Sequence, residues 1–174
     1  VNDAWNDPDW GTLVWLAMMV GPRRGEVSAL RWSDLELDSP SPVVTLRRSI
    51  GQHGGQVWEK DTKTHQRRRV SLDEYTVGIL REHRTRCKER AAALHLTLPK
   101  DGFVFSLAPD CSTPLRPDTV TQKYGRLAKR LGVQTHFHAL RHYSATELIA
   151  AGVDVRTVAG RLGHGGGGAT TLRV

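Results

Sequence analysis

The chain has 174 residues, of which 39% are hydrophobic and 25% charged, as expected for one globular domain with a core of its own. The net charge of +7 favours an anionic partner, most commonly nucleic acid, and no apolar run is long enough to span a membrane. The two cysteines, Cys87 and Cys111, lack the spacing of metal ligands, so we expect reduced thiols in the cytoplasm. Because the chain begins at Val1 instead of a Met, we also expect it to be a fragment of a longer protein.

In chain order, the first predicted helix is capped by Asp9 and ends at the Gly-Pro pair 21–22, and a short helix with Val27 and Leu30 facing inward follows. Turn residues and β-branched residues then predict three strands in consecutive hairpins, over 42–50, 56–60 and 67–72. Start and stop signals predict four more helices and a short strand, over 73–95, 117–133, 138–152, 154–163 and 103–105. We therefore expect an α+β fold that is mostly helical, with the helices packed around a small antiparallel three-stranded sheet.

Residues 135–142 read THFHALRH and could hold either a metal or a phosphate. His138 and His142 lie four positions apart on the predicted helix and so share a face. A zinc site needs three or four ligands, however, and Ala139 stands where the helical metalloprotease signature requires Glu. A basic zinc-binding regulatory module is therefore the least supported interpretation, and we expect no metal.

A phosphate site fits the same stretch better. His138 would lie in the first turn of its helix, where free backbone N–H groups attract anions, and Arg141 follows one turn later. A guanidinium binds two phosphate oxygens with a planar fork, and a histidine can exchange a proton near neutral pH. A capped helix with solvated basic residues explains this stretch alone equally well.

Three other stretches carry residues of the same chemistry. In GPRRGE, Arg23 precedes Glu26 by three positions; in DTKTHQ, Lys63 lies at a predicted turn; in RLGHGG, His164 follows a helix end. Each has an ordinary alternative: a surface ion pair, a solvated turn lysine, and a histidine bonded to the last helix carbonyls. The order of these stretches along the chain is more informative than any one of them.

Arg23 with Glu26, then Lys63, then HxxRH at 138–142, then LGH, resembles the catalytic domain of the tyrosine recombinases, also called phage integrases. The resemblance spans nearly the whole chain. It implies cleavage and rejoining of double-stranded DNA, in which a tyrosine attacks a backbone phosphate and forms a 3′-phosphotyrosyl link. The bond energy stays in that link, so the resemblance implies no cofactor.

The resemblance also assigns roles by position. Arg23 and Arg141 match the two arginines that hold the non-bridging phosphate oxygens, where negative charge gathers in the transition state. His164 matches a third phosphate contact, and Lys63 matches the general acid that protonates the leaving 5′-oxygen. His138 matches the base that assists the attacking phenol.

The remaining polar residues have less specific roles. Glu26 matches an acidic position that orients the other side chains, and for His136 and His142 we expect packing or surface roles. Charge and position suggest DNA-backbone contacts for eight residues: Lys60, Arg67, Arg68, Arg69, Lys123, Arg126, Lys129 and Arg130. The family implies a tetramer on DNA for the full-length protein. This chain lacks the N-terminal DNA-binding domain and the C-terminal segment, so we expect a single catalytic domain that is monomeric.

The family's nucleophile is missing from the chain. Its tyrosine follows LGH by about nine to eleven residues in the family, a window that begins at Arg173 and runs past Val174. We expect a tyrosine within about two residues after Val174, in a bacterial or phage-encoded protein that associates with the nucleoid. The alternative is a DNA-binding relic that keeps the fold without catalysis. Tyr143 lies inside the HxxRH stretch, where we expect it to pack in the core, so it does not replace the nucleophile.

Overall fold

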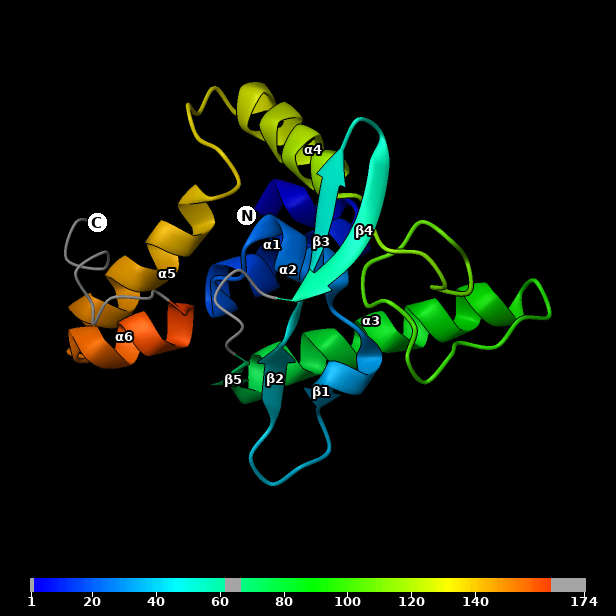
Figure 1. Ribbon diagram of the computed structural model, residues 1–174, viewed down its shortest axis with the longest axis horizontal. Helices are drawn as coiled ribbons and strands as arrows, with labels where there is room; N and C mark the ends of the chain where they lie inside the picture. Colours follow the sequence, from blue (N-terminus) through cyan, green and yellow to red (C-terminus); the bar gives the residue numbers. More distant parts are fainter. Residues whose placement is uncertain (1, 62–66, 164–174) are drawn as a thin grey trace.

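The structure, a computed structural model, describes residues 2–61 and 67–163, and these ranges hold six α-helices and five strands (Figure 1). The helices are α1 (Pro8–Val20), α2 (Arg24–Ala29), α3 (Glu74–Ala92), α4 (Pro117–Arg130), α5 (Ala139–Ala150) and α6 (Val155–Leu162). The strands are β1 (Leu35–Glu36), β2 (Val43–Leu46), β3 (Arg48–His53), β4 (Gln56–Asp61) and β5 (Arg68–Ser71). The expected mostly helical α+β fold with a small antiparallel sheet is confirmed.

The strands pair differently from the predicted consecutive hairpins. β1, β2 and β5 form a three-stranded antiparallel sheet in that order, while β3 and β4 form a separate two-stranded ribbon. The predicted strand over 42–50 is broken at Arg47, where Arg47 Nε and Arg48 Nη1 both donate to the buried carboxylate of Asp34, at 2.6 and 3.0 Å. Neighbouring residues of a continuous strand point to opposite faces and could not share one carboxylate.

Two predicted element boundaries are corrected by the structure. Asp7, not Asp9, caps α1: its Oδ1 accepts the Trp10 N–H at 3.1 Å, and Pro8 takes the first helical position. Asp9 lies inside the first turn and binds side chains of α3 instead. The predicted strand over 103–105 is reduced to one isolated bridge, between Arg31 and Phe103.

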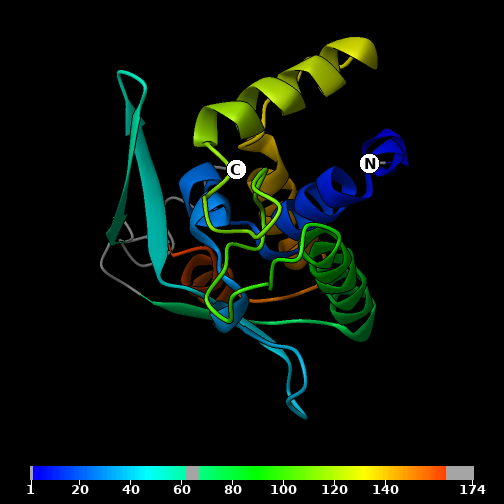
Figure 2. The ribbon, with the colours of Figure 1, turned by 90° about the vertical axis from the view of Figure 1, so that its right-hand side faces the viewer.

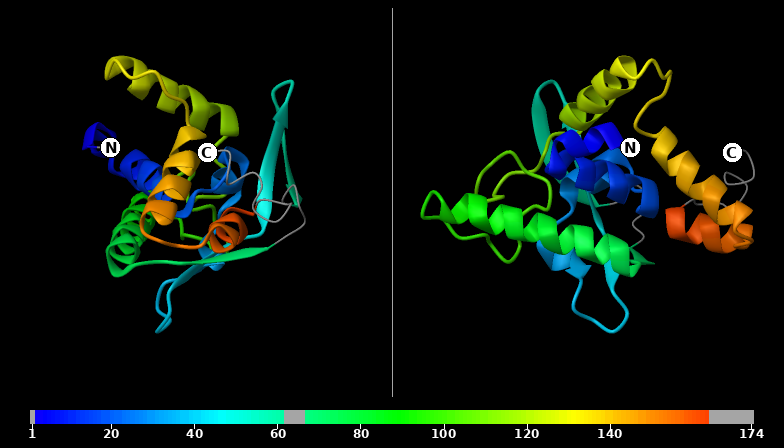
Figure 3. Two further views of the ribbon diagram at one scale, coloured as in Figure 1. Left: turned by 90° about the vertical axis from the view of Figure 1, so that its left-hand side faces the viewer. Right: turned by 180° about the vertical axis from the view of Figure 1, so that it is seen from behind.

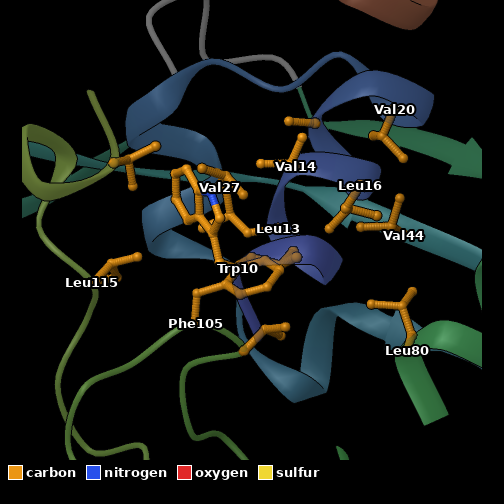
Figure 4. Close-up of a cluster of buried hydrophobic side chains, with 14 of the residues drawn as sticks. Trp10, Leu13, Val14, Leu16, Val20, Val27, Val44, Leu80, Phe105 and Leu115 are labelled. Atoms are coloured by element: carbon orange, nitrogen blue, oxygen red, sulfur yellow. The ribbon is translucent and has the colours of Figure 1, made fainter. Parts of the chain in front are cut away.

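The main hydrophobic core surrounds α1, which is buried along most of its length (Figure 4). Leu13 and Leu16 of α1 meet Val44 of β2, Leu80 of α3 and Phe105 from the long connection between α3 and α4. Because α1 also contacts α5, this core fixes where α5 begins relative to the end of α1.

The other elements are arranged around this core in two groups. α5 and α6 pack side by side at one side of the molecule (Figure 1). The β3–β4 ribbon projects along the edge of the molecule in the two side views (Figures 2 and 3). Its turn lies beside the start of α4, where the Asp118 N–H donates to Gln52 Oε1 at 3.1 Å.

β3 passes directly over α2 at Gly25. A Cβ at Gly25 would lie 2.6 Å from the Ile50 carbonyl oxygen, so only glycine allows this close approach. The ribbon is thereby held next to the N-terminal end of α2, which carries the first predicted site residue.

Candidate active site

The connection between α1 and α2 carries Arg23. This residue caps the N-terminus of α2, whose third residue, Glu26, reaches back toward it. Glu26 Oε2 accepts the Arg23 backbone N–H at 2.7 Å, and Glu26 Oε1 accepts from Arg23 Nη1 at 3.0 Å. Because the Glu26 side chain is only 1% exposed, this is not an ordinary surface ion pair.

A second arginine reaches Glu26 from β5. Arg68 donates from Nη1 to Oε1 at 3.1 Å and from Nη2 to Oε2 at 2.7 Å, so its guanidinium grips the carboxylate with both ends. The Arg68 side chain is 4% exposed, whereas that of Arg23 is 29% exposed. This placement contradicts the expected DNA-backbone contact of Arg68, because its fork is buried on Glu26.

The start of α5 contributes His138 and Arg141. His138 is the N-cap residue of α5, and the Arg141 N–H donates to its carbonyl at 3.1 Å. The Arg141 side chain is buried, with Nη1 donating to the Gly21 carbonyl at 2.6 Å and Nη2 donating to the Leu162 carbonyl. A guanidinium has five N–H donors, so three remain for another acceptor.

The two predicted phosphate-binding arginines are held by neighbouring carbonyls at the end of α6. Arg23 Nη2 donates to the Gly163 carbonyl at 3.2 Å, one residue after the Leu162 carbonyl that Arg141 binds. The structure thus brings Arg23, Glu26 and Arg141 together where the ends of α1 and α6 meet the starts of α2 and α5. Lys63 and His164 lie outside the described residues.

Three guanidinium groups crowd one carboxylate at this place. Burial, and then the charges of Arg23 and Arg68, lower the pKa of Arg141 to about 9, while Glu26 acts in the opposite direction. Burial alone would raise the pKa of Glu26, but the hydrogen bond and charge of Arg68 and the contacts with Arg23 hold that pKa below its usual range. Among the described residues of this cluster, positive charge exceeds negative charge, so binding of an anion such as phosphate would relieve the repulsion.

His138 lies beside this cluster at the mouth of a pocket. Burial, followed by the charges of His142, Arg141, His136 and Arg23, lowers the pKa of His138. A histidine kept neutral at physiological pH can accept a proton. The pocket has a volume of about 310 Å³ and is lined by Arg23, Arg24, Thr121, His136, Phe137 and His138.

The two other histidines of the stretch surround His138. The His142 ring stands edge-to-face with the His138 ring, with centroids 5.0 Å apart, and the His136 ring is stacked at 6.5 Å. Both are exposed, and their expected packing or surface roles stay predictions. In the part of the chain that the structure describes, no group of three potential ligands could hold a metal ion.

The residues expected to contact the DNA backbone separate into two regions. Lys60 of β4, Arg67 just before β5 and Arg69 of β5 are exposed, and Arg69 binds Glu36 at 3.0 Å. On α4, the exposed basic residues are Arg126, Lys129 and Arg130. Lys123 differs from them, because it pairs with Asp7 and lies 4.9 Å from the centroid of the Trp10 ring.

The structure corrects the expected position of Tyr143. Tyr143 does not pack in the core but is 45% exposed on α5. Among the described helices, none is both long enough and apolar enough to cross a membrane.

The sequence interpretation did not find the contact of Arg68 with Glu26. A signal was present, because residues alternate between faces along a strand and Val70, two positions on, is a typical inward residue. An arginine on the same face as Val70 has to be paired when it is buried. Three consecutive arginines at 67–69 looked like a solvated basic run instead.

Comparison with known proteins matches residues 11–171 to the model of the phage integrase family. A tyrosine recombinase XerC-like protein of Caldanaerobacter subterraneus subsp. tengcongensis is 29% identical over 161 residues, which cover 86% of this chain and 41% of that protein. The ICEBs1 integrase of Bacillus subtilis is 28% identical over 156 residues, 88% of this chain and 41% of its own length. The chain thus spans about two fifths of the length of these relatives.

Solved structures share the fold at lower identity. The Tn1549 transposon integrase in complex with transposon right end DNA superposes with a TM-score of 0.74 at 20% identity, covering 93% of this chain and 52% of that one. The XerA recombinase gives a TM-score of 0.69 at 22% identity, covering 98% of this chain and 58% of that one. With the family match over most of its length, the chain belongs to the phage integrase family, the tyrosine recombinases.

Proposed function

We propose that this chain is the catalytic domain of a site-specific DNA recombinase or integrase that cleaves and rejoins strands through a 3′-phosphotyrosyl intermediate. The observation that carries the proposal is the meeting of Arg23 and Arg141 in a cluster with surplus positive charge, beside His138. Membership of a family of recombinases and integrases supports the same reaction. The Tn1549 integrase, solved with transposon DNA, supports double-stranded DNA as the substrate.

The scissile phosphate would lie against Arg23 and the free donors of Arg141. As the phenol oxygen attacks phosphorus, charge builds up on the non-bridging oxygens, and fixed guanidinium donors stabilise that charge without reorganising. Losing one such donor costs about 100-fold to 1,000-fold in rate in well-studied sites. His164 would supply a further donor to the same oxygens, and Glu26 would hold Arg23 in place.

Two proton transfers accompany the exchange of one P–O bond for another. The phenol loses its proton as the new P–O bond forms, and His138, whose lowered pKa favours the neutral imidazole, would accept it. The bond between phosphorus and the 5′-oxygen breaks, and Lys63 would give that oxygen a proton. Rejoining reverses both transfers, so the reaction consumes no cofactor.

The DNA would be held by the exposed basic residues on both sides of the site. Lys60 lies on β4, Arg67 and Arg69 at β5, and Arg126, Lys129 and Arg130 on α4. Contacts of this type position the duplex and read no sequence. Lys123 remains a weaker candidate, since Asp7 already neutralises it. A full-length protein of this kind would act as a tetramer on two DNA sites in the bacterial cytoplasm, and this chain alone would be a monomer.

The attacking tyrosine would lie just past Val174. Tyr75, Tyr124 and Tyr143 all precede LGH in the chain, so none of them fits the family position. The second candidate function is a DNA-binding relic of the same fold, since neither Arg173 nor Val174, with which the family window begins, is a tyrosine. The presence of Arg23, Lys63, His138, Arg141 and His164 favours the active enzyme.

A nicked duplex that releases a short 5′-hydroxyl fragment traps the covalent intermediate and separates the two functions. The chain continued through the expected tyrosine, called the extended protein below, should form a 3′-phosphotyrosyl adduct that a denaturing gel resolves. The chain as printed should bind the duplex weakly and form no adduct. An extended protein that binds but never forms the adduct would identify a relic, and an adduct on the printed chain would show that another nucleophile acts.

A further inference from the structure

Arg68 has no place in the proposed chemistry, yet it is one of the buried charged groups of the site. Its side chain is 4% exposed, and both of its terminal nitrogens are on Glu26. Among the described residues its Nε has no hydrogen-bond partner. Desolvation of both charges offsets most of the attraction within a buried ion pair, so this contact alone stabilises the fold little.

The contact links three groups in a row from the interior to the surface. Glu26 Oε1 accepts from both Arg68 and Arg23, and Oε2 accepts from Arg68 and from the Arg23 backbone. Among the described residues, all the hydrogen bonds to this carboxylate come from these two arginines, and of the two only Arg23, at 29% exposure, is accessible to a ligand. The orientation of Arg23 therefore depends on a carboxylate that Arg68 holds from behind.

Arg68 also packs against the segment that precedes His164. Gly163 ends α6 with φ of 66°, and a Cβ there would lie 2.7 Å from Arg68 Cδ and would overlap its guanidinium. The Gly163 carbonyl in turn accepts from Arg23 Nη2 at 3.2 Å. Glycine at this position lets the end of α6 rest on Arg68 while it meets Arg23.

On the basis of the proposed function, we propose that Arg68 is a positioning residue for DNA cleavage, which keeps Glu26 ionised and oriented so that Glu26 fixes Arg23 on the scissile phosphate. Arg68 itself does not contact DNA. Its effect on the rate passes through the charge of Glu26, which distinguishes it from a residue that only fills space.

The charge of Glu26 gives the experiment its specific signal. Glu26 is faced by Arg23 from its own helix, by Arg68 from β5 and by Arg141 from α5. In the Arg68→Gln variant, Arg23 and Arg141 remain to oppose the rise in the Glu26 pKa that burial causes, but Arg68 no longer does, so the pKa of Glu26 should rise. Protonated Glu26 would release Arg23, and cleavage should weaken as the pH falls from about 8 to about 6. Protonation of His138, whose pKa is lowered, should limit the wild type only at more acidic pH.

Single-turnover cleavage of the nicked duplex by the extended protein, measured at saturating DNA, tests the positioning role of Arg68. Arg68→Gln should lower the rate by up to about 100-fold at pH 7, with little change in DNA affinity, and adding Glu26→Gln should remove the new acid dependence. Arg68→Lys, which keeps the charge but not the fork, should recover part of the rate. Arg81→Gln, which removes an exposed arginine of α3 that pairs with Asp38, is the control and should match the wild type. A wild-type rate and pH profile in Arg68→Gln or in Arg68→Lys would overturn the proposal.

A second measurement needs no cleavage and uses the 174-residue chain without the added tyrosine segment. If Arg68→Gln raises the pKa of Glu26 in the folded protein above its value in the unfolded chain, protonation of Glu26 adds to the free energy of unfolding at low pH. This contribution is lost as the pH rises through the folded pKa. Tm should then fall by about 3 °C or more between about pH 5.5 and 8, relative to the double variant Arg68→Gln with Glu26→Gln. Equal Tm profiles for these two variants would contradict the inference.

Arg141→Lys, assayed in the extended protein, tests the proposed function separately, because it does not alter the pair of Arg68 and Glu26.

Discussion

Two carboxylates of this chain, Asp9 and Glu26, each gather several basic side chains. In the Asp9 cluster, Oδ1 contacts His83 Nδ1 and Arg86 Nε, both at 3.0 Å, and Oδ2 accepts from Arg90 Nη1 at 2.7 Å. These contacts join α1 to α3. In the Glu26 cluster, the partners come from three separate elements, α2, β5 and α5. The composition of the two clusters is therefore similar, but their connections differ.

The Asp9 cluster and the Glu26 cluster differ in whether solvent can screen their excess positive charge. Arg86 and Arg90 are 30% and 37% exposed, so solvent can screen their charge. In the Glu26 cluster, Arg68 and Arg141 are buried at 5% and 3% exposure, and their charge is confined. A confined positive charge attracts an anionic ligand, whereas a solvated one mainly links two helices. Exposure of the surplus charge thus separates a candidate phosphate site from a structural ion cluster.

The largest expected effect of this difference is on stability at the Asp9 cluster. Asp9→Asn would leave two partly exposed arginines and the buried His83 without their shared carboxylate, and after allowing for solvent screening we expect it to lower the free energy of unfolding by about 2 kcal/mol. Urea unfolding of the printed chain measures the change. DNA cleavage by the extended protein should stay at the wild-type rate, since Asp9 does not hold the phosphate site.

Asp38→Asn is the matched control for that substitution. Asp38 also pairs with an arginine, Arg81 at 2.9 Å, but its side chain is 82% exposed, so the change should stay below about 1 kcal/mol. If both variants are equally stable, the Asp9 cluster does not stabilise the fold in the way described.

A smaller effect is expected in acid. Burial opposes ionisation of Asp9, but the hydrogen bonds from His83 and Arg90 outweigh it and hold the pKa of Asp9 well below its usual range. A depressed folded pKa contributes stability above the unfolded pKa, and this contribution is lost as pH falls through the folded value. The wild type should therefore lose more stability than Asp9→Asn between about pH 5 and pH 3, measured by urea unfolding. Parallel losses would show that Asp9 is not the group responsible.

Much of the fold could be predicted from the sequence because local signals agree with it. Pro117 and Gly163 mark the start of α4 and the end of α6, where the structure has them. The pairing of β5 with β2 could not be predicted, because it depends on Arg47 and Arg48 meeting on one buried carboxylate. Such a long-range contact leaves no periodic signal in the strand itself.

Four residues of the site were predictable from the sequence, and Arg68 was not. The order of Arg23, Glu26, His138 and Arg141 along the chain indicated a phosphate site, and the structure brings them together. Arg68 was assigned to the DNA surface because charge alone suggests exposure. Its burial depends on the pairing with Glu26, whose helix α2 packs against β3, and neither contact is visible in the sequence.

The most direct test of the account exchanges one arginine in each cluster for lysine. Arg141→Lys and Arg90→Lys both keep a positive charge and lose the planar fork. On the nicked duplex, we predict that Arg141→Lys in the extended protein lowers the single-turnover rate of adduct formation by about 100-fold or more, while Arg90→Lys stays within about threefold of the wild type. Adduct formation by Arg141→Lys at the wild-type rate, or an equal loss in both variants, would contradict the assignment of the phosphate site to the Glu26 cluster.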